Sequence, residues 1–248
     1  MAAPTSFPEF RQDPFDTQQL ECRVFKLWLK QDISDTAALA SRIDAVGADL
    51  ICCFSRCSAA HIDCMQRLGF RLISVRQTYD LDLASDLLVP DVPGFTLRLA
   101  APGEALSPQD LSGLAETIGS SSRYFKDPSI PRARSQALYE SWLRNSLAGY
   151  ATAVVLGMQD ESVLGIHSLR IDHGTGVVDL IGVQPRVQGS GLGRALLCFG
   201  LRECARRGVA RVRVVTEGEN EGASRFYQRH GFLLRSTELV WHRHRFPT

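Results

Sequence analysis

The chain has 248 residues, 44% of them hydrophobic, which is enough for one large domain or two small ones with apolar cores. Its formal net charge of +1 shows no basic excess of the kind that binds nucleic acids. The sequence has no apolar run near the ~18 residues that span a bilayer, and no apolar signal-peptide core at its start. We therefore expect a soluble, cytoplasmic protein that binds neither nucleic acids nor membranes.

The first third of the chain alternates strands and helices. Leu39, Ile43 and Val46 recur on one helical face, and Asp35 can cap the helix that they predict. The predicted strands span 22–29, 49–55 and 70–83, and the predicted helices span 35–48 and 58–69. Two prolines and a glycine between 87 and 95 then mark a linker. This pattern predicts two domains, 1–90 and 95–248.

The second segment begins with a strand at 95–100 and a helix that Ser107 caps, with Pro108 at its first position. A loop is predicted from 120 to 135. Beyond these, the predicted helices span 136–149, 191–207 and 221–230, and the predicted strands span 151–158, 162–172, 177–185, 210–217 and 232–244.

The seven cysteines include a short cluster, Cys53, Cys57 and Cys64, around His61. No CxxC pair is present, and this spacing fits no common zinc template. We interpret these residues as reduced thiols in buried strands and helices, and we predict no metal centre.

One short segment recurs along the chain. The sequence MQRLGFRL at 65–72 reappears as YQRHGFLL at 227–234, which is 162 residues later. A junction of helix, glycine and strand often looks this way, but the repeat also fits a duplicated unit whose first copy has decayed. The first copy has no glycine loop and carries Met65 where the second carries Tyr227. We therefore expect the chemistry in the second half.

Three alternate glycines, Gly189, Gly191 and Gly193, precede an apolar helix. The dinucleotide fingerprint would need a glycine where this chain has Arg194, and the Gly-Lys-Ser/Thr of a triphosphate loop is absent. The unpaired amides of a helix N-terminus favour an anion such as a pyrophosphate. Tight packing of the helix on a strand is the alternative interpretation.

Two stretches, LIGVQPRVQGSGLGRALL at 180–197 and NEGASRFYQRHGF at 220–232, resemble the GNAT acetyltransferase superfamily. The first matches its (Gln/Arg)-x-x-Gly-x-(Gly/Ala) motif, and the second its Asn-x-x-Ala-x-x-x-Tyr-x-x-x-Gly-Phe motif. The likeness covers about residue 95 to the C-terminus. It implies an α/β fold with a mixed, mostly antiparallel sheet flanked by helices, and a degenerate GNAT-like half before it.

The resemblance implies acetyl-CoA as co-substrate. Its diphosphate would bind the amides of the loop formed by Gln188, Gly189, Ser190, Gly191, Leu192, Gly193 and Arg194. The pantetheine arm would contact Ile181, Gly182, Val183, Asn220 and Ala223. We expect a bulge at Gly182 that opens a cleft, and Asn220 is also a good N-cap for the following helix.

For catalysis, Tyr227 is the candidate that would protonate the thiolate leaving group. Asp179 is the first candidate for the base, and His167, on the adjacent strand, is the second and would face the acceptor. Tyr227 as a core tyrosine, and Asp179 and His167 as ordinary strand residues, are the structural alternatives.

The stretch from 120 to 147 looks like acetyltransferases of TDP-linked amino sugars, in particular the dTDP-fucosamine acetyltransferases, although this chain is longer at the glycine loop. The likeness implies a nucleotide-linked amino sugar as acceptor, with Arg123 on phosphate and Tyr124 or Phe125 against a ring. A free amine or protein N-terminus as acceptor, a non-catalytic acyl-CoA sensor and a homodimer remain open.

Overall fold

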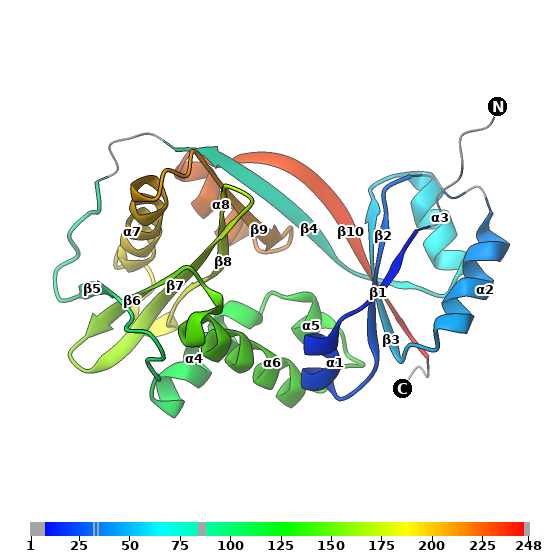
Figure 1. The fold of residues 1–248 in the computed structure, drawn as a ribbon, viewed down its shortest axis with the longest axis horizontal. Helices are drawn as coiled ribbons and strands as arrows, with labels where there is room; N and C mark the ends of the chain where they lie inside the picture. The colour runs from blue at the N-terminus through cyan, green and yellow to red at the C-terminus, as the bar shows by residue number, and fades with distance from the viewer. Residues whose placement is uncertain (1–7, 32, 34, 84–87, 246–248) are drawn as a thin grey trace.

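A single mixed sheet runs through the protein, whose computed structural model describes residues 8–31, 33, 35–83 and 88–245 (Figure 1). The strands in chain order are β1 (Phe10–Gln12), β2 (Val24–Leu29), β3 (Leu50–Arg56), β4 (Arg71–Asp82), β5 (Thr96–Leu99), β6 (Ala153–Gln159), β7 (Ser162–Asp172), β8 (Thr175–Val183), β9 (Arg211–Glu217) and β10 (Leu233–His244). Their order across the sheet is β1-β2-β3-β10-β4-β9-β8-β7-β6-β5. The pairs β2–β3 and β8–β9 are parallel, and the others are antiparallel.

Helices cover both faces of this sheet. They are α1 (Pro14–Leu20), α2 (Thr36–Val46), α3 (Ala59–Arg67), α4 (Pro108–Gly119), α5 (Arg123–Lys126), α6 (Arg132–Asn145), α7 (Leu192–Arg206) and α8 (Glu221–Arg229). In Figure 1, α7 lies above the sheet of the second segment, α4 and α6 lie below it, and α2 and α3 lie at the far end of the molecule. No helix in the described part of the chain is long and apolar enough to cross a membrane.

The predicted strands and helices are confirmed, with ends that shift by a few residues. Asp35 and Ser107 cap their helices as expected, each accepting a backbone N–H. The sequence analysis missed β1, α1 and α5, and α6 begins at Arg132, inside the predicted loop. Short elements of three to seven residues, such as β1 and α1, carry too little periodicity to be recognised, although Asp13 and Pro14 form an ordinary helix start.

The recurring segment of the sequence extends into three consecutive elements. A shift of 162 residues carries α3 onto α8 and β4 onto β10 over their full lengths, and β3 matches β9 in the same order. The pairing is equivalent as well, because the pairs Leu233↔Asp80 and His242↔Arg71 of β10 and β4 exchange under this shift. Each long strand lies in the other segment's part of the sheet: β4 between β10 and β9, and β10 between β3 and β4. The sheet therefore continues across the predicted boundary between 1–90 and 95–248.

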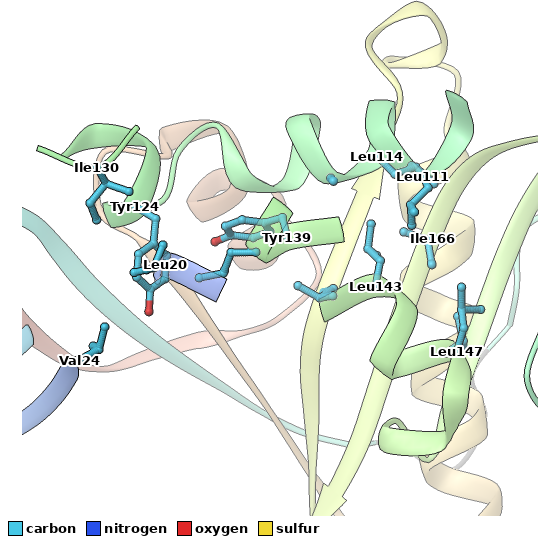
Figure 2. Close-up of a cluster of buried hydrophobic side chains, with 14 of the residues drawn as sticks. Leu20, Val24, Leu111, Leu114, Tyr124, Ile130, Tyr139, Leu143, Leu147 and Ile166 are labelled. Atoms are coloured by element: carbon cyan, nitrogen blue, oxygen red, sulfur yellow. The ribbon is translucent and has the colours of Figure 1, made fainter. Parts of the chain in front are cut away.

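A shared apolar cluster joins the two segments on the side of α4 and α6 (Figure 2). Leu20 and Val24 come from the first segment, and Leu114, Leu143 and Ile166 from the second; each is at most 3% exposed. Burying side chains of this size contributes about 1.5–3 kcal/mol each. The cluster therefore holds α1 and β2 against α4 and α6, and this fixes one wall of the site described next.

Candidate active site

The parallel strands β8 and β9 separate part of the way along. Their pairing runs from Thr175 and Arg211 to Val178 and Val214 and then ends, although both strands continue. The register of β7 and β8 shifts at this point and leaves Asp179 without a partner on β7, so β8 carries a bulge there. A cavity of about 390 Å³ lies between the diverging strands.

The bulge that we predicted at Gly182 therefore lies three residues earlier. Gly182 itself pairs in register with Ile166. A Cβ at Gly182 would come within 2.4 Å of Ile118 Cγ1, so glycine at this position allows α4 to approach the strand closely. The cleft does open on the expected strand, but the residue displaced into it is Asp179.

The glycine loop leaves several amides available at the start of α7. Gly189 and Gly191 have φ of 82° and 92°, which favours glycine, and their N–H groups have no partner among the described residues. The first hydrogen bond within α7 runs from Ala195 N to Gly191 O, 3.1 Å, so the N–H groups of Gly193 and Arg194 precede it. Gln188 Nε2 donates to Val183 O at 3.2 Å and ties the loop to β8. This arrangement suits a diphosphate.

Tyr227, Asn220 and Ala223 line the cavity from α8. Asn220 Oδ1 accepts from Ala223 N at 3.0 Å, so this side chain both caps α8 and borders the cavity. Tyr227 is 5% exposed, and burial raises the pKa of its phenol well above the usual value near 10. The phenol therefore keeps its proton at neutral pH, as a proton donor must.

Asp179 lies between the first cavity and a second one of about 530 Å³, and it lines both. Burial raises its pKa above the usual 3.8, although Arg170 Nε donates to Asp179 Oδ2 at 3.3 Å and opposes the rise. A carboxylate with a raised pKa is a better proton acceptor than an exposed one.

The second cavity is rich in carboxylates and aromatic rings. Lys26 lies 3.2 Å from Asp16 and also pairs with Asp13, so its charge is neutralised locally. Phe15 and Trp142 stack with ring centroids 6.1 Å apart. The described residues that line this cavity are Asp13, Phe15, Asp16, Lys26, Trp142, Asn145, Ser146, Tyr150, Asp179 and Leu180. The first segment thus supplies part of its wall, through α1 and β2.

Of the four predicted acceptor-binding residues, the structure places Arg123 alone at a cavity wall. Its buried guanidinium lies 4.2 Å from the Tyr124 ring centroid and donates to the Tyr124 hydroxyl. Tyr124 is fully buried and donates in turn to Asp16, so its ring offers no surface to a ligand. Phe125 packs against Tyr139 with centroids 5.9 Å apart.

His167 lies on the face of β7 that packs against α7, away from both cavities. It is 1% exposed, and its Nδ1 lies 3.0 Å from Leu196 O. Burial lowers its pKa to about 4, so the ring is neutral at physiological pH. A Cβ on Gly200 would come within 2.1 Å of the ring, which shows how closely α7 covers it. The geometry gives no support for His167 as an acceptor ligand or a base.

Several cavity residues escaped the sequence analysis, notably Lys26, Trp28 and Phe54. Their signal is strand alternation: Leu27 and Leu29 point into the core under α2 and α3, so Lys26 and Trp28 occupy the opposite face. A charged residue and an aromatic one on the second face of an otherwise apolar strand indicate a lined cavity. The sequence alone does not show that this face of β2 lies opposite Asp179.

The comparisons with known proteins agree with this geometry. Residues 120–232 match the family model of the acetyltransferase (GNAT) family. This part of the chain belongs to the GNAT family. A GCN5-related N-acetyltransferase from Sphaerobacter thermophilus superposes with a TM-score of 0.67 and 16% identity, over 96% of this chain and 76% of that one. A tandem GNAT protein from the clavulanic acid biosynthesis pathway gives 0.60 and 13%, over 92% and 79%. The predicted GNAT fold is confirmed.

Curated relatives of the chain include mycothiol acetyltransferases. That of Streptomyces avermitilis is 29% identical over 181 residues, which are 71% of this chain and 56% of the relative. That of Streptomyces scabiei is 30% identical over 67% of this chain and 51% of the relative. The spore coat polysaccharide biosynthesis protein SpsD of Bacillus subtilis is 27% identical over 60% and 51%. The chain spans about half the length of these relatives, and none of the three is named a dTDP-fucosamine acetyltransferase.

Proposed function

We propose that this protein transfers the acetyl group of acetyl-CoA to the amine of a small polar molecule. The observation that carries the proposal is the meeting of two cavities at Asp179, with Tyr227 in the wall of the first. The first cavity lies between β8 and β9, and residues of both segments of the chain line each cavity. A coenzyme and an acceptor that enter from opposite sides would meet between these two side chains.

The residues around the first cavity fit acetyl-CoA. The free amides at Gly189, Gly191 and the first turn of α7 would hold the diphosphate, and the unpaired edge of β8 beyond Val178 would pair with the amide-bearing pantetheine arm. Asn220 and Ala223 would border that arm. The coenzyme supplies an activated thioester and a thiol leaving group.

Proton movement is assigned to the two side chains with raised pKa values. Asp179 Oδ would accept the proton of the acceptor ammonium or amine, so that nitrogen attacks with a free electron pair. The Tyr227 hydroxyl would donate its proton to the departing sulfur. Each transfer contributes about 10²–10⁴-fold when the group is in place.

For the acceptor, we propose an amino sugar or a similar hydroxylated amine. Asp179 suits a cationic amine, and the Trp142 and Phe15 rings suit the face of a sugar. The name of the mycothiol acetyltransferases is consistent with a small acceptor, and that of SpsD with an acceptor from sugar metabolism. The nucleotide-linked form implied by the sequence would bring a diphosphate to an acidic cavity, so we place free amino sugars ahead of it.

The first half of the chain, residues 1–90, is proposed to be a degenerate copy of the second. Its parallel pair β2–β3 stays in register through Leu29 and Ser55, without the separation that opens the cavity between β8 and β9. We therefore expect one coenzyme site per chain. Calorimetric titration with acetyl-CoA measures this, and two equivalent sites would contradict the proposal.

The function is tested with Tyr227→Phe. The tyrosine hydroxyl has no hydrogen-bond partner among the described residues, and the ring contacts of phenylalanine are the same, so folding and CoA binding should persist. Release of CoA thiol in the presence of amino sugars should fall about 10²–10⁴-fold. A binding protein that only senses acyl-CoA would show no thiol release with any amine, and this outcome would overturn the proposal. Assays with free amino sugars, nucleotide-linked amino sugars and simple amines in parallel decide the acceptor class.

A further inference from the structure

Three metal-ligating side chains converge at the end of β10, outside both cavities. His242 Nδ1 lies 2.5 Å and His244 Nε2 lies 2.7 Å from the same oxygen, Asp127 Oδ2. All three candidate ligand atoms lie within 4.8 Å of one another, and among the described residues no other group of three His, Cys, Asp or Glu side chains meets this condition. The cysteines around His61, which first suggested a metal in the sequence, do not form such a group.

The backbone explains the convergence. His242 and His244 are two residues apart on a strand, so their side chains share one face of the sheet. Asp127 follows α5, and its Oδ1 accepts from Ser129 N at 2.9 Å. This bond fixes the carboxylate and leaves Oδ2 to face the two rings.

Two of the three candidate ligands are buried, and the third is partly exposed to solvent. The side chains of His242 and Asp127 are 0% and 1% exposed, whereas that of His244 is 20% exposed. An ion can therefore enter past His244, and a water molecule can complete its coordination. His242 Nδ1 donates to Asp127 Oδ2, so the proton on that nitrogen must leave when an ion binds there.

We propose that Asp127, His242 and His244 bind a divalent transition-metal ion, with Zn²⁺ the best match to two imidazoles and one carboxylate. Zinc accepts nitrogen and carboxylate oxygen at about 2.0–2.2 Å, and three protein ligands with one water are a common set. Donor atoms around a tetrahedral ion lie roughly 3.3 Å apart, so the Asp127 oxygen and the two imidazole nitrogens, now 2.5 and 2.7 Å apart, must separate by about 0.6–0.8 Å when an ion enters. Binding releases the proton that each coordinating nitrogen held.

The ion would join two parts of the second segment rather than take part in acetyl transfer. It would join the end of β10, which pairs with β3 of the first segment, to the connection between α5 and α6. The His242 ring lies 6.4 Å from that of Tyr124, which holds Asp16 in the acceptor cavity. The metal would thus stabilise the position of Tyr124 and, through it, the wall of the second cavity that contains Asp16.

The test uses the full chain, treated with a chelator and then titrated with Zn²⁺ alone by calorimetry, and with Co²⁺ for its visible absorption. We expect one ion per chain and intense Co²⁺ bands of a four-coordinate site. His244→Asn and Asp127→Asn should each weaken binding about tenfold or more. His173→Asn is the matched control, because the His173 side chain is 98% exposed, and it should bind as the wild type does.

Failure to bind Zn²⁺ at micromolar concentration, or equal binding by His244→Asn and the wild type, would overturn the proposal. If Asp127→Asn does not fold, His244→Asn decides alone, since its side chain is the most exposed of the three. These measurements do not depend on acetyl transfer, so they test the metal site independently of the proposed function.

Discussion

Replacement of Gly182 by alanine tests whether the close approach of α4 to β8 shapes the coenzyme cavity. The new Cβ would lie 2.4 Å from Ile118 Cγ1 and 3.2 Å from its Cδ1. Carbon atoms in contact prefer about 3.5–4.0 Å, so Ile118 must move by about 1 Å or more. Ile118 is also part of the wall of the first cavity, so the displacement has an effect on ligand binding as well as on packing.

The expected loss of stability follows from the overlap between the new Cβ and Ile118. Overpacking of this kind costs about 1–3 kcal/mol, which lowers the melting temperature of a chain of this size by about 2–12 °C. If half of that cost reappears on coenzyme binding, KM for acetyl-CoA rises about 2- to 12-fold. Thermal unfolding and CoA-release kinetics measure the two effects on one preparation.

A double variant separates the clash from other effects of the methyl group. In Gly182→Ala/Ile118→Ala the atoms at 2.4 Å and 3.2 Å are gone, and the next contact, to the Cβ of residue 118, is an ordinary 3.8 Å. The double variant should therefore be more stable than the sum of the two single losses predicts. Gly113→Ala, on the facing helix α4, is the control, because its nearest contact would be an ordinary 3.6 Å. A Gly182→Ala protein with unchanged melting temperature and KM would refute this reasoning.

Three further predictions concern single side chains. Asp179→Asn should lower kcat/KM about 10²–10⁴-fold. It should also remove the acid limb of the pH–rate profile, and that limb should lie above the usual range for an aspartate because burial raises the pKa of Asp179. An unchanged profile would exclude Asp179 as the base. Asn220→Ala should destabilise the protein by about 0.5–2 kcal/mol in urea unfolding, whereas Asn220→Asp, which keeps the cap, should not. Hydrogen bonds from Arg98 lower the pKa of Glu104 from 4.5 to about 2, so this pair adds stability above pH 4.5 that is lost as the pH falls toward 2. Glu104→Gln should therefore lose less stability between pH 5 and pH 3 than the wild type does. An equal loss in the two proteins would contradict the assignment.

The local structure was largely readable from the sequence because it is encoded locally. The strand at 162–172 has the predicted ends, Ser107 and Asp35 cap the predicted helices, and the glycine loop precedes α7 where the motif placed it. Each of these depends on spacing or capping within a few residues.

The parts that could not be read depend on contacts between distant segments. Nothing near Asp16 indicates that it faces Lys26 and a tyrosine more than a hundred residues away, or that it lines a cavity with Asp179. The bulge in β8 is set by its register with β7, which pattern alone places only to within a few residues. The resemblance to amino-sugar acetyltransferases implied Tyr124 as a surface for a ligand ring, whereas the predicted loop is here a short helix with its tyrosine buried.

The interleaving of β4 and β10 has a consequence for how the protein can be divided. A fragment that begins at residue 95 would retain Asp179, Tyr227 and the glycine loop, yet it would lack the strand that joins β9 to β10. Both edges of β10 and one edge of β9 would then have unpaired amides and carbonyls, which is a condition for aggregation. We expect such a fragment to recover its native state only when the first 83 residues are supplied, even as a separate polypeptide, because the two halves of the chain share one sheet.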